Sequence, residues 1–182
     1  MPIVQAPRKL PRNAGLTLIE VLTAISLMGI VTAVAATNFT AMVPGFRTRG
    51  AALLVAGDLN QARMLAIKEG RIYQYFPLAG GYRIRRDNGA GGWVTLKEVL
   101  INNTYPHVNF GHSGITDDPY AIAIGSSAPT GPIAFQSDGT VQNPAGVFLE
   151  SASGDEYVQH AVTLSAAGRV RVWKYGGSAW HG

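Results

Sequence analysis

The stretch that decides the fold is residues 15–43, GLTLIEVLTAISLMGIVTAVAATNFTAMV, an apolar run with one charged side chain, Glu20. As a helix, residues 16–43 would be about 42 Å long, which exceeds the roughly 30 Å hydrocarbon core of a bilayer. A leader, residues 1–15, precedes the run and carries three positive charges and no negative ones. Basic residues on this side hold the N-terminal end in the cytoplasm. The stretch therefore predicts a membrane-spanning helix with the rest of the chain on the opposite side.

Two ordinary interpretations of this stretch leave Glu20 unexplained. A secretory signal peptide has an apolar core of about 7–15 residues, shorter than this run, although the alanines near residue 35 keep signal peptidase cleavage open as an alternative. A plain single-pass anchor is the second interpretation. An acidic residue inside a membrane helix costs up to about 3 kcal/mol and usually has a functional partner. A new α-amino group at Leu16, created by cleavage after Gly15, would be a suitable partner.

Residues 15–20, GLTLIE, resemble the type IV prepilin signature, in which cleavage follows Gly and Glu stands at the fifth position after the cut. The first residue after the cut is usually Phe in that family, and here it is Leu16. The resemblance implies that a prepilin peptidase cuts between Gly15 and Leu16 and N-methylates Leu16. It also implies that Glu20 neutralises the amine of an adjacent subunit during fibre assembly.

A second helix is predicted over residues 44–70, after an interruption or kink at Pro44. Its apolar positions recur at helical spacing, which favours packing on a sheet, and Gly70 is the expected C-terminal stop. Residues 61–70, QARMLAIKEG, are similar to the AR-x-x-A-I-x-x-G segment of the GspH/FimT branch of pilin-like proteins. That branch includes minor pseudopilins of type II secretion and minor pilins of type IV pili. The resemblance implies a type IV pilin-like α+β fold, with the long helix packed on an antiparallel β-sheet domain.

Residues 71–182 are predicted to form that β-rich domain, because the apolar period changes to two and turn residues become frequent. Residues 133–141, IAFQSDGTV, resemble the F-x-x-D-G hairpin of the same branch, and Asp-Gly suits a turn with left-handed backbone. The predicted strands are 71–76, 82–86, 93–96, 108–110, 120–124, 133–135, 147–149, 161–164 and 169–175.

Composition excludes several classes of function. The chain has no Cys, which excludes disulfides, thiolate metal sites and cysteine nucleophiles. The four His show no metal-ligand spacing, and no motif for catalysis is present, so we expect neither an enzyme nor a cofactor. Of the 15 Lys and Arg side chains three lie in the leader, so the remainder carries 12 against 11 Asp and Glu. A nucleic-acid interface would therefore need local clustering of charge.

One such cluster lies near the C terminus, where no acidic side chain follows Glu156. In a strand over 169–175, alternation places two arginines and two aromatic rings on one face and two valines on the other. The first face would hold Arg169, Arg171, Trp173 and Tyr175, the second Val170 and Val172, and Lys174 adds a further cation. Cations with rings suit phosphates and bases, although an edge strand with a charged, solvated face is the plainer interpretation. Residues 168–171, GRVR, resemble the G-R-x-R motif of FimT-type minor pilins, which bind DNA during natural transformation.

The sequence thus predicts a minor pilin or pseudopilin in the bacterial inner membrane, single-pass, with its globular domain in the periplasm. It would assemble with other pilins or pseudopilins and their assembly machinery into a type II secretion pseudopilus or a type IV pilus, and so support protein secretion. The alternative is a FimT-like minor pilin that binds DNA through Arg169, Arg171 and Lys174 for natural transformation.

Overall fold

The computed structural model describes residues 15–112, 131–152 and 159–182, so the strand expected at 120–124 lies outside the described residues. The chain divides into two units, Met1–Ala41 and Met42–Gly182. One long helix, α1 (Leu18–Glu69), begins in the first unit and ends in the second. Each unit is described by itself below.

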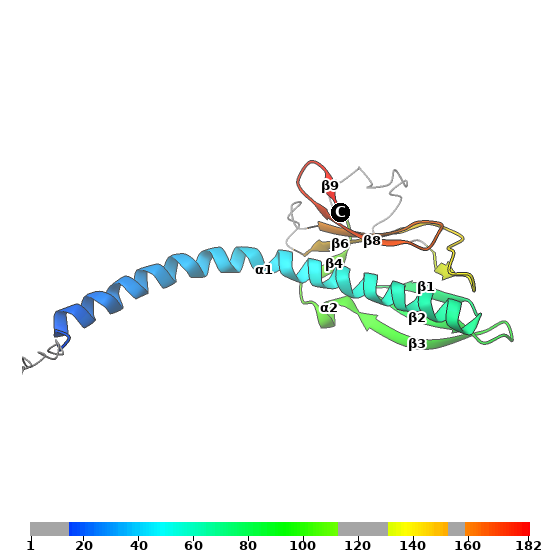
Figure 1. The fold of residues 1–182 in the computed structure, drawn as a ribbon, viewed down its shortest axis with the longest axis horizontal. Coiled ribbons are helices and arrows are strands. Elements are labelled where there is room, and N and C mark those ends of the chain that lie inside the picture. The colour runs from blue at the N-terminus through cyan, green and yellow to red at the C-terminus, as the bar shows by residue number, and fades with distance from the viewer. Residues whose placement is uncertain (1–14, 113–130, 153–158) are drawn as a thin grey trace, which may run out of the picture. The chain divides into compact units, whose positions relative to one another are not determined.

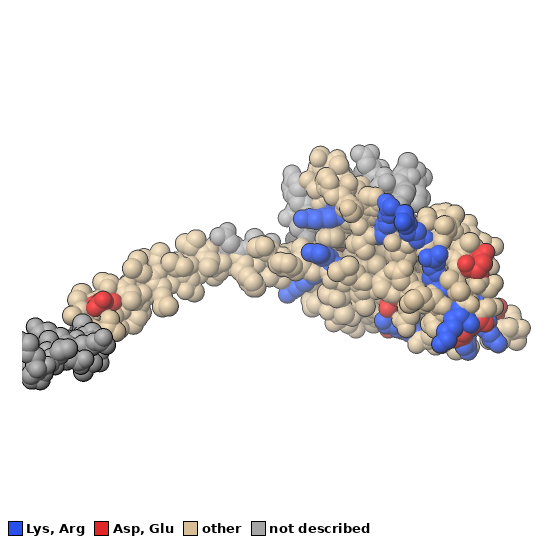
Figure 2. Space-filling view, in the orientation of Figure 1, with Lys and Arg blue, Asp and Glu red and all other residues tan. Residues whose placement is uncertain are grey.

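The described part of the first unit is the apolar beginning of α1. The segment Leu18–Ala36 is long and apolar enough to cross a membrane, with a mean hydropathy of 2.2, and none of it is buried inside the protein. Figure 2 shows its surface as almost entirely uncharged. Apolar side chains stay exposed in water only at a cost of about 25 cal/mol per Å². This surface therefore needs a bilayer or neighbouring chains to cover it.

The helix does not break at Pro44, where the sequence predicted an interruption or a kink. Proline lacks one backbone donor and so removes one bond of the helical ladder, but the following turns remain helical. Thr48, which is fully buried, donates its hydroxyl to the carbonyl oxygens of Pro44 and Gly45, both at 3.2 Å. The interruption is therefore excluded, whereas a kink, the other alternative, is compatible with a continuous helix.

The end of α1 agrees with the prediction. The helix stops at Glu69, and Gly70 follows with a φ of +64°. Glycine adopts this left-handed backbone without a steric penalty, which is why it commonly terminates helices. The amide of Arg71 then donates to the carbonyl oxygen of Ala66 at 3.3 Å, so a carbonyl of the last turn keeps a partner.

The second unit contains two antiparallel sheets that pack along the second part of α1 (Figure 1). Within the described residues, the first sheet has the strand order β3-β2-β1-β5 and the second has the order β4-β6-β7-β8-β9. The elements are β1 (Tyr73–Leu78), β2 (Gly81–Asp87), β3 (Trp93–Leu100), the single turn α2 (Ile101–Thr104), β4 (Val108–Phe110), β5 (Ile133–Phe135), β6 (Gly146–Ser151), β7 (Gln159–Leu164), β8 (Val170–Tyr175) and β9 (Trp180–His181). The α+β architecture predicted from the sequence, a long helix packed on antiparallel sheet, is confirmed.

The core lies between α1 and the inner faces of both sheets. The helical stripe predicted from the sequence is buried as expected, at Ala51, Val55, Leu59, Ala62 and Ala66. Most of these side chains are small, so the helix approaches the sheets closely. Large rings of the first sheet fill the space opposite, and Tyr75 stacks on Tyr82 with ring centroids 4.9 Å apart.

A buried carboxylate ties α1 to the first sheet. The side chain of Asp58 is enclosed, and its oxygens accept hydrogen bonds from the Tyr82 hydroxyl at 2.6 Å and the Lys97 ammonium at 2.7 Å. Burial and the neighbouring carboxylate both raise the pKa of Tyr82, so its hydroxyl remains a donor. A buried charge is tolerated when it is paired and hydrogen-bonded in this way.

Strand β3 forms the edge of the first sheet and is longer than the predicted 93–96. Among the described residues it pairs only with β2, and the register shifts between Ile84 and Arg85, which marks a β-bulge. Seven of its eight residues are exposed, including four large apolar side chains: Trp93, Val94, Leu96 and Leu100. The strand continues past residue 96, where Lys97 pairs with Asp58 and Glu98 pairs with Arg83. These charged residues therefore extend the edge strand instead of ending it.

Candidate assembly and nucleic-acid interfaces

The predicted cleavage site lies just before α1 begins. Gly15 and Leu16 precede the first helical residue, Leu18, and are not helical themselves. The Leu16 side chain is 75% exposed, and a side-chain carbon at Gly15 would meet no other atom within 4 Å. The bond between Gly15 and Leu16 therefore lies outside the helix, in an exposed stretch of backbone.

Glu20 stands in the first turn of α1, where the helix leaves backbone N–H groups without partners. The Thr17 hydroxyl accepts a hydrogen bond from the backbone N–H of Glu20 at 3.3 Å. A carboxylate in this turn also interacts favourably with the positive end of the helix dipole. Sequence analysis considered only the α-amino group of Leu16, in the same chain or a neighbouring subunit, as the partner of Glu20 and missed this contact. The spacing T-x-x-E at residues 17–20 is the signal that indicates it.

The basic C-terminal hairpin has the valine face that the sequence predicted. Strand β8 pairs with β7 from the Leu164 and Val170 pair to the His160 and Lys174 pair. Val170 and Val172 pack against the core, while Arg169 and Arg171 are exposed. The Arg171 guanidinium lies 5.9 Å from the centre of the Trp173 ring. Two cations and one ring are thus presented on the face away from the core.

The aromatic part of that face is smaller than predicted. Tyr175 is buried, because the sequence continues into β9 and Trp180 packs against it with ring centroids 5.3 Å apart. Trp173 is half-buried and donates its indole N–H to the Thr163 hydroxyl at 2.8 Å. Lys174 is exposed, but strand alternation places it on the opposite face from Arg171. The structure thus brings Arg169 and Arg171 together and does not group Tyr175 or Lys174 with them.

Elsewhere on the described part of the second unit, three basic side chains are paired with acidic ones. Among the described residues, the ion pairs join Arg83 to Glu98, Arg86 to Glu69 and Lys97 to Asp58 at 2.7–2.9 Å, and the hairpin arginines take part in none of them. On the face shown in Figure 2, the blue groups near β8 and β9 are likewise set apart from the red groups. The two hairpin arginines can therefore meet an anionic ligand, as can other exposed cations outside these ion pairs, such as Arg49 and Lys68.

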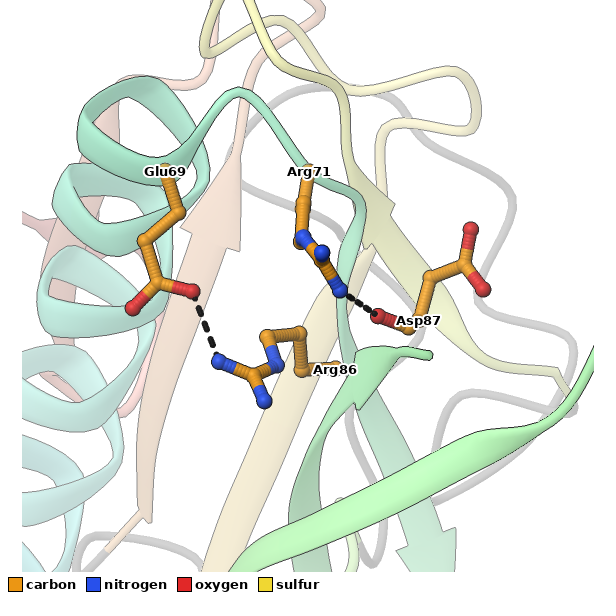
Figure 3. A network of polar contacts seen from close by, with 4 residues as sticks. All are labelled: Glu69, Arg71, Arg86 and Asp87. Atoms are coloured by element: carbon orange, nitrogen blue, oxygen red, sulfur yellow. Dashed lines mark hydrogen bonds and ion pairs between the residues drawn. The ribbon is translucent and has the colours of Figure 1, made fainter. Parts of the chain in front are cut away.

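Figure 3 shows how two of the other arginines are used at the end of α1. Arg86 donates to the Glu69 carboxylate at 2.9 Å, and Arg71 donates to the backbone carbonyl of Asp87 at 3.4 Å. The hydrogen bond from Arg86, followed by one from Tyr73, holds the pKa of the Glu69 carboxyl below its ordinary value. These contacts fasten the helix end to β1 and β2, and they serve the fold.

A further arginine joins three parts of the second unit that are distant in sequence. Arg63 on α1 donates from Nε to the Gly139 carbonyl at 3.0 Å and from Nη2 to the Ala167 carbonyl at 2.9 Å. Gly139 belongs to the turn after β5, and Ala167 to the turn between β7 and β8. The hairpin that carries Arg169 is therefore bound directly to the helix.

The family follows from comparison with known proteins. A profile of the family described as "Type II transport protein GspH" matches residues 51–168, which is more than half of the chain. The chain belongs to the GspH family. A second profile, the prokaryotic N-terminal methylation motif, matches residues 10–36. No curated protein matches the sequence significantly.

Solved structures of minor pilins and pseudopilins share the fold of this GspH-family chain. The minor pseudopilin EpsH from the type 2 secretion system of Vibrio cholerae is 14% identical, with a TM-score of 0.53 over 70% of this chain and 97% of that one. The type IV minor pilin FimU of Pseudomonas aeruginosa is also 14% identical, with a TM-score of 0.51 over 74% of this chain and 92% of that one. At such identities the likeness establishes the fold alone.

The GspH family is one of structural pilin and pseudopilin proteins and not one of known enzymes, so membership is consistent with a role as a pilus or pseudopilus subunit. The methylation motif implies processing by a prepilin peptidase and assembly with other pilins, and the apolar helix is suited to anchor the chain in a membrane. The family match ends at residue 168, so it covers Arg63 and both of its acceptors but not Arg169 and Arg171.

Sequence analysis missed the role of Arg63. The segments that meet there had each been quoted as family motifs: AR at residues 62–63, DG at 138–139 and GR at 168–169. These motifs were a usable signal. Two of them contain Gly, and glycine commonly marks a place where the backbone approaches another segment closely. The contact itself joins residues 76 and 104 positions apart, which no local pattern specifies.

Proposed function

We propose that this GspH-family chain is a minor pseudopilin or pilin subunit that a prepilin peptidase cleaves between Gly15 and Leu16 and methylates on Leu16. The processed chain enters a type II secretion pseudopilus or a type IV pilus and supports protein secretion. Its apolar helix lies in the bacterial inner membrane with the second unit in the periplasm, as the basic leader favours.

One observation carries this proposal: the methylation motif falls where the backbone is accessible and the next helix is uncovered. The match over residues 10–36 contains Gly15, Leu16 and Glu20. Gly15 and Leu16 lie outside the helix, and the helix that follows exposes its apolar side chains. A subunit stored in a membrane and later packed among other helices needs both features.

Processing is tested by producing the full chain in membranes with and without a prepilin peptidase, followed by mass spectrometry of the N terminus. We expect a new N terminus at Leu16 carrying one methyl group, only when the peptidase is present. Gly15→Val, which adds a branched side chain next to the cut, serves as the uncleaved control. Cleavage near Ala36 instead would support a secretory signal peptide and contradict the proposal.

Assembly is tested with two variants that separate the functions of the first turn. Glu20→Gln removes the charge that would meet the neighbouring amine, and we expect normal cleavage but poor entry into fibres. Thr17→Val removes the hydroxyl that bonds the Glu20 amide and keeps the carboxylate, so it should enter fibres nearly as well as the unaltered chain. The readout is the amount of subunit in sheared fibres. Normal incorporation of Glu20→Gln would refute the charge-pairing role.

A second candidate function is DNA binding by the C-terminal hairpin, supported by the exposed side chains of Arg169 and Arg171, which lie outside the ion pairs of the described residues. Neutralising two or three phosphates of duplex DNA predicts that log affinity falls with log salt with a slope of roughly −2 to −3. The detergent-solubilised full chain is titrated with duplex DNA at several salt concentrations. No binding at low salt, or unchanged binding in an Arg169→Ala/Arg171→Ala double variant, would eliminate this function.

A further inference from the structure

The contact between α1 and the two turns is too close for side chains. Gly139 and Gly168 both have left-handed backbone, with φ of +79° and +74°. A Cβ on Gly168 would stand closer to the Gly139 carbonyl oxygen than any real contact allows, and 2.7 Å from the Arg63 Nε. A Cβ on Gly139 would stand 2.6 Å from the Ile67 side chain on the helix. The two glycines therefore let both turns reach the Arg63 guanidinium.

Backbone hydrogen bonds join the two turns to each other and to the start of the basic strand. The Val141 amide donates to the Ala166 carbonyl at 2.8 Å, and the Gly168 amide donates to the Ser165 carbonyl at 2.8 Å. The Arg169 amide donates to the Ser165 hydroxyl at 3.2 Å. Only one residue separates Ala167, which Arg63 holds, from Arg169. The direction in which Arg169 leaves the turn is thus set by a short, bonded segment.

We infer that Arg63 is a positioning residue for the anion-binding hairpin, holding the turn of residues 165–168 so that Arg169 and Arg171 face a polyanionic backbone together. This inference rests on the DNA-binding candidate above. The guanidinium uses two of its donors on two separate carbonyl groups, a geometry that its planar fork supports and a lysine ammonium on a flexible stem does not fix. Arg63 acts through the turn and does not contribute a phosphate contact of its own.

The salt dependence of DNA binding separates positioning from direct contact, because each phosphate contact adds about 0.9 to the slope on duplex DNA. Arg63→Lys keeps the charge and loses the fork. For the detergent-solubilised full chain we expect it to bind duplex DNA about tenfold more weakly at every salt concentration, with an unchanged slope. Arg171→Ala should instead reduce the slope by about one.

Two further variants make the test specific. Lys68→Gln removes a charge from an exposed position on the same helix and should leave affinity near that of the unaltered chain, whereas Arg63→Gln should weaken binding at least as much as Arg63→Lys. Gly168→Ala, which forces the two turns apart, should reproduce the loss caused by Arg63→Lys. Equal losses for Lys68→Gln and Arg63→Gln, or a slope that falls by about one in Arg63→Gln and not in Arg63→Lys, would show that Arg63 acts through its charge and would overturn the inference.

Amide hydrogen exchange tests the positioning contact without DNA. The amides of Val141 and Gly168 should exchange faster in Arg63→Lys, while core amides such as that of Val162 should not change. Unchanged exchange at both turn amides would overturn the role of Arg63 even if DNA binding were confirmed. Absence of DNA binding by the unaltered chain, together with faster exchange, would eliminate the DNA-binding candidate and confine Arg63 to holding the turns.

Discussion

The two parts of α1 belong to one helix, yet they differ in how their side chains are covered, and so in what constrains their sequences. Between Leu18 and Ala36 every side chain is exposed, so no partner inside the protein distinguishes one face from another. In the second unit the same helix buries one face, including Leu59 and Ala62, and leaves Leu53 and Met64 exposed. In the first part, a partner can recognise only the order of residues along the chain. In the second part, folding depends on which residues share the buried face of the helix.

This difference explains why the two parts tolerate change differently. Under the processing proposed above, the peptidase contacts consecutive residues of GLTLIE, so a single substitution at Gly15 or Glu20 should affect function and leave folding intact. A buried face contacts only the rest of its own domain, so a substitution there should affect folding first. Three measurements test how strongly buried and exposed parts of the molecule contribute to its stability.

The largest expected effect is loss of the buried helical face. Leu59→Ala deletes a fully buried side chain between the helix and the sheets and should lower the free energy of unfolding of the second unit by about 2–5 kcal/mol. Leu27→Ala, the same substitution at a position 63% exposed, should leave that unfolding transition unchanged. Denaturant unfolding of the full chain in detergent, followed by near-ultraviolet circular dichroism, measures both. Equal shifts of the midpoint would remove the distinction between the two parts.

A smaller effect is expected from a buried histidine on β7. Burial of His160, followed by the nearby charges of Lys174 and Arg49, lowers its pKa from about 6.5 to about 4. The unfolded chain therefore binds a proton more readily than the folded one between these values. Stability should be full above pH 6.5 and fall toward pH 4, by about 3 kcal/mol in all if each pKa unit counts about 1.4 kcal/mol.

The measurement is the difference in unfolding free energy between the unaltered chain and His160→Asn as a function of pH. Carboxyl groups with lowered pKa values, such as Asp138, also destabilise the folded state as pH falls through those values, but they do so equally in both proteins. The difference should therefore change between pH 6.5 and 4 and be flat above pH 7. A constant difference across this range would show that His160 can take up its proton without unfolding.

The smallest effect should come from the exposed edge of the first sheet. Arg83 and Glu98 form an ion pair at 2.7 Å with side chains 41% and 43% exposed. A double-mutant cycle with Arg83→Gln and Glu98→Gln should give a coupling energy of about 0.2–1 kcal/mol that disappears in high salt. A coupling above 2 kcal/mol that persists in high salt would mean that this edge is held as firmly as the core.

Most of the fold could be predicted because its signals are local. Gly70 ends the helix and Asp138-Gly139 makes the expected hairpin turn, with φ of +79° at the glycine and the Asp138 carboxylate bonded to the Thr140 amide at 2.9 Å. Glycine conformations and side-chain periodicity are properties of short segments, so sequence patterns report them well. The prediction of two valines facing the core on β8 succeeded for the same reason.

The errors have a common physical cause, which is tertiary contact. Pro44 was given the penalty of an isolated helix, yet the helix continues into a segment stabilised by burial. Tyr175 has the alternation of an exposed residue, yet Trp180 covers it from a strand only two residues long. Arg63 reads as one more cation on a solvated helix, yet it binds carbonyl groups from two distant turns.

Strand β3 bears on whether copies of this chain pair with one another through an exposed sheet edge. An open sheet edge invites other copies of the same chain to pair with it. The bulge beside Arg85 and the charges of Lys97 and Glu98 interrupt this edge, although Trp93 and Leu96 leave apolar surface along it. The bulge and the charges thus disfavour pairing between the edges of identical chains, while the exposed apolar side chains can still contact a different protein.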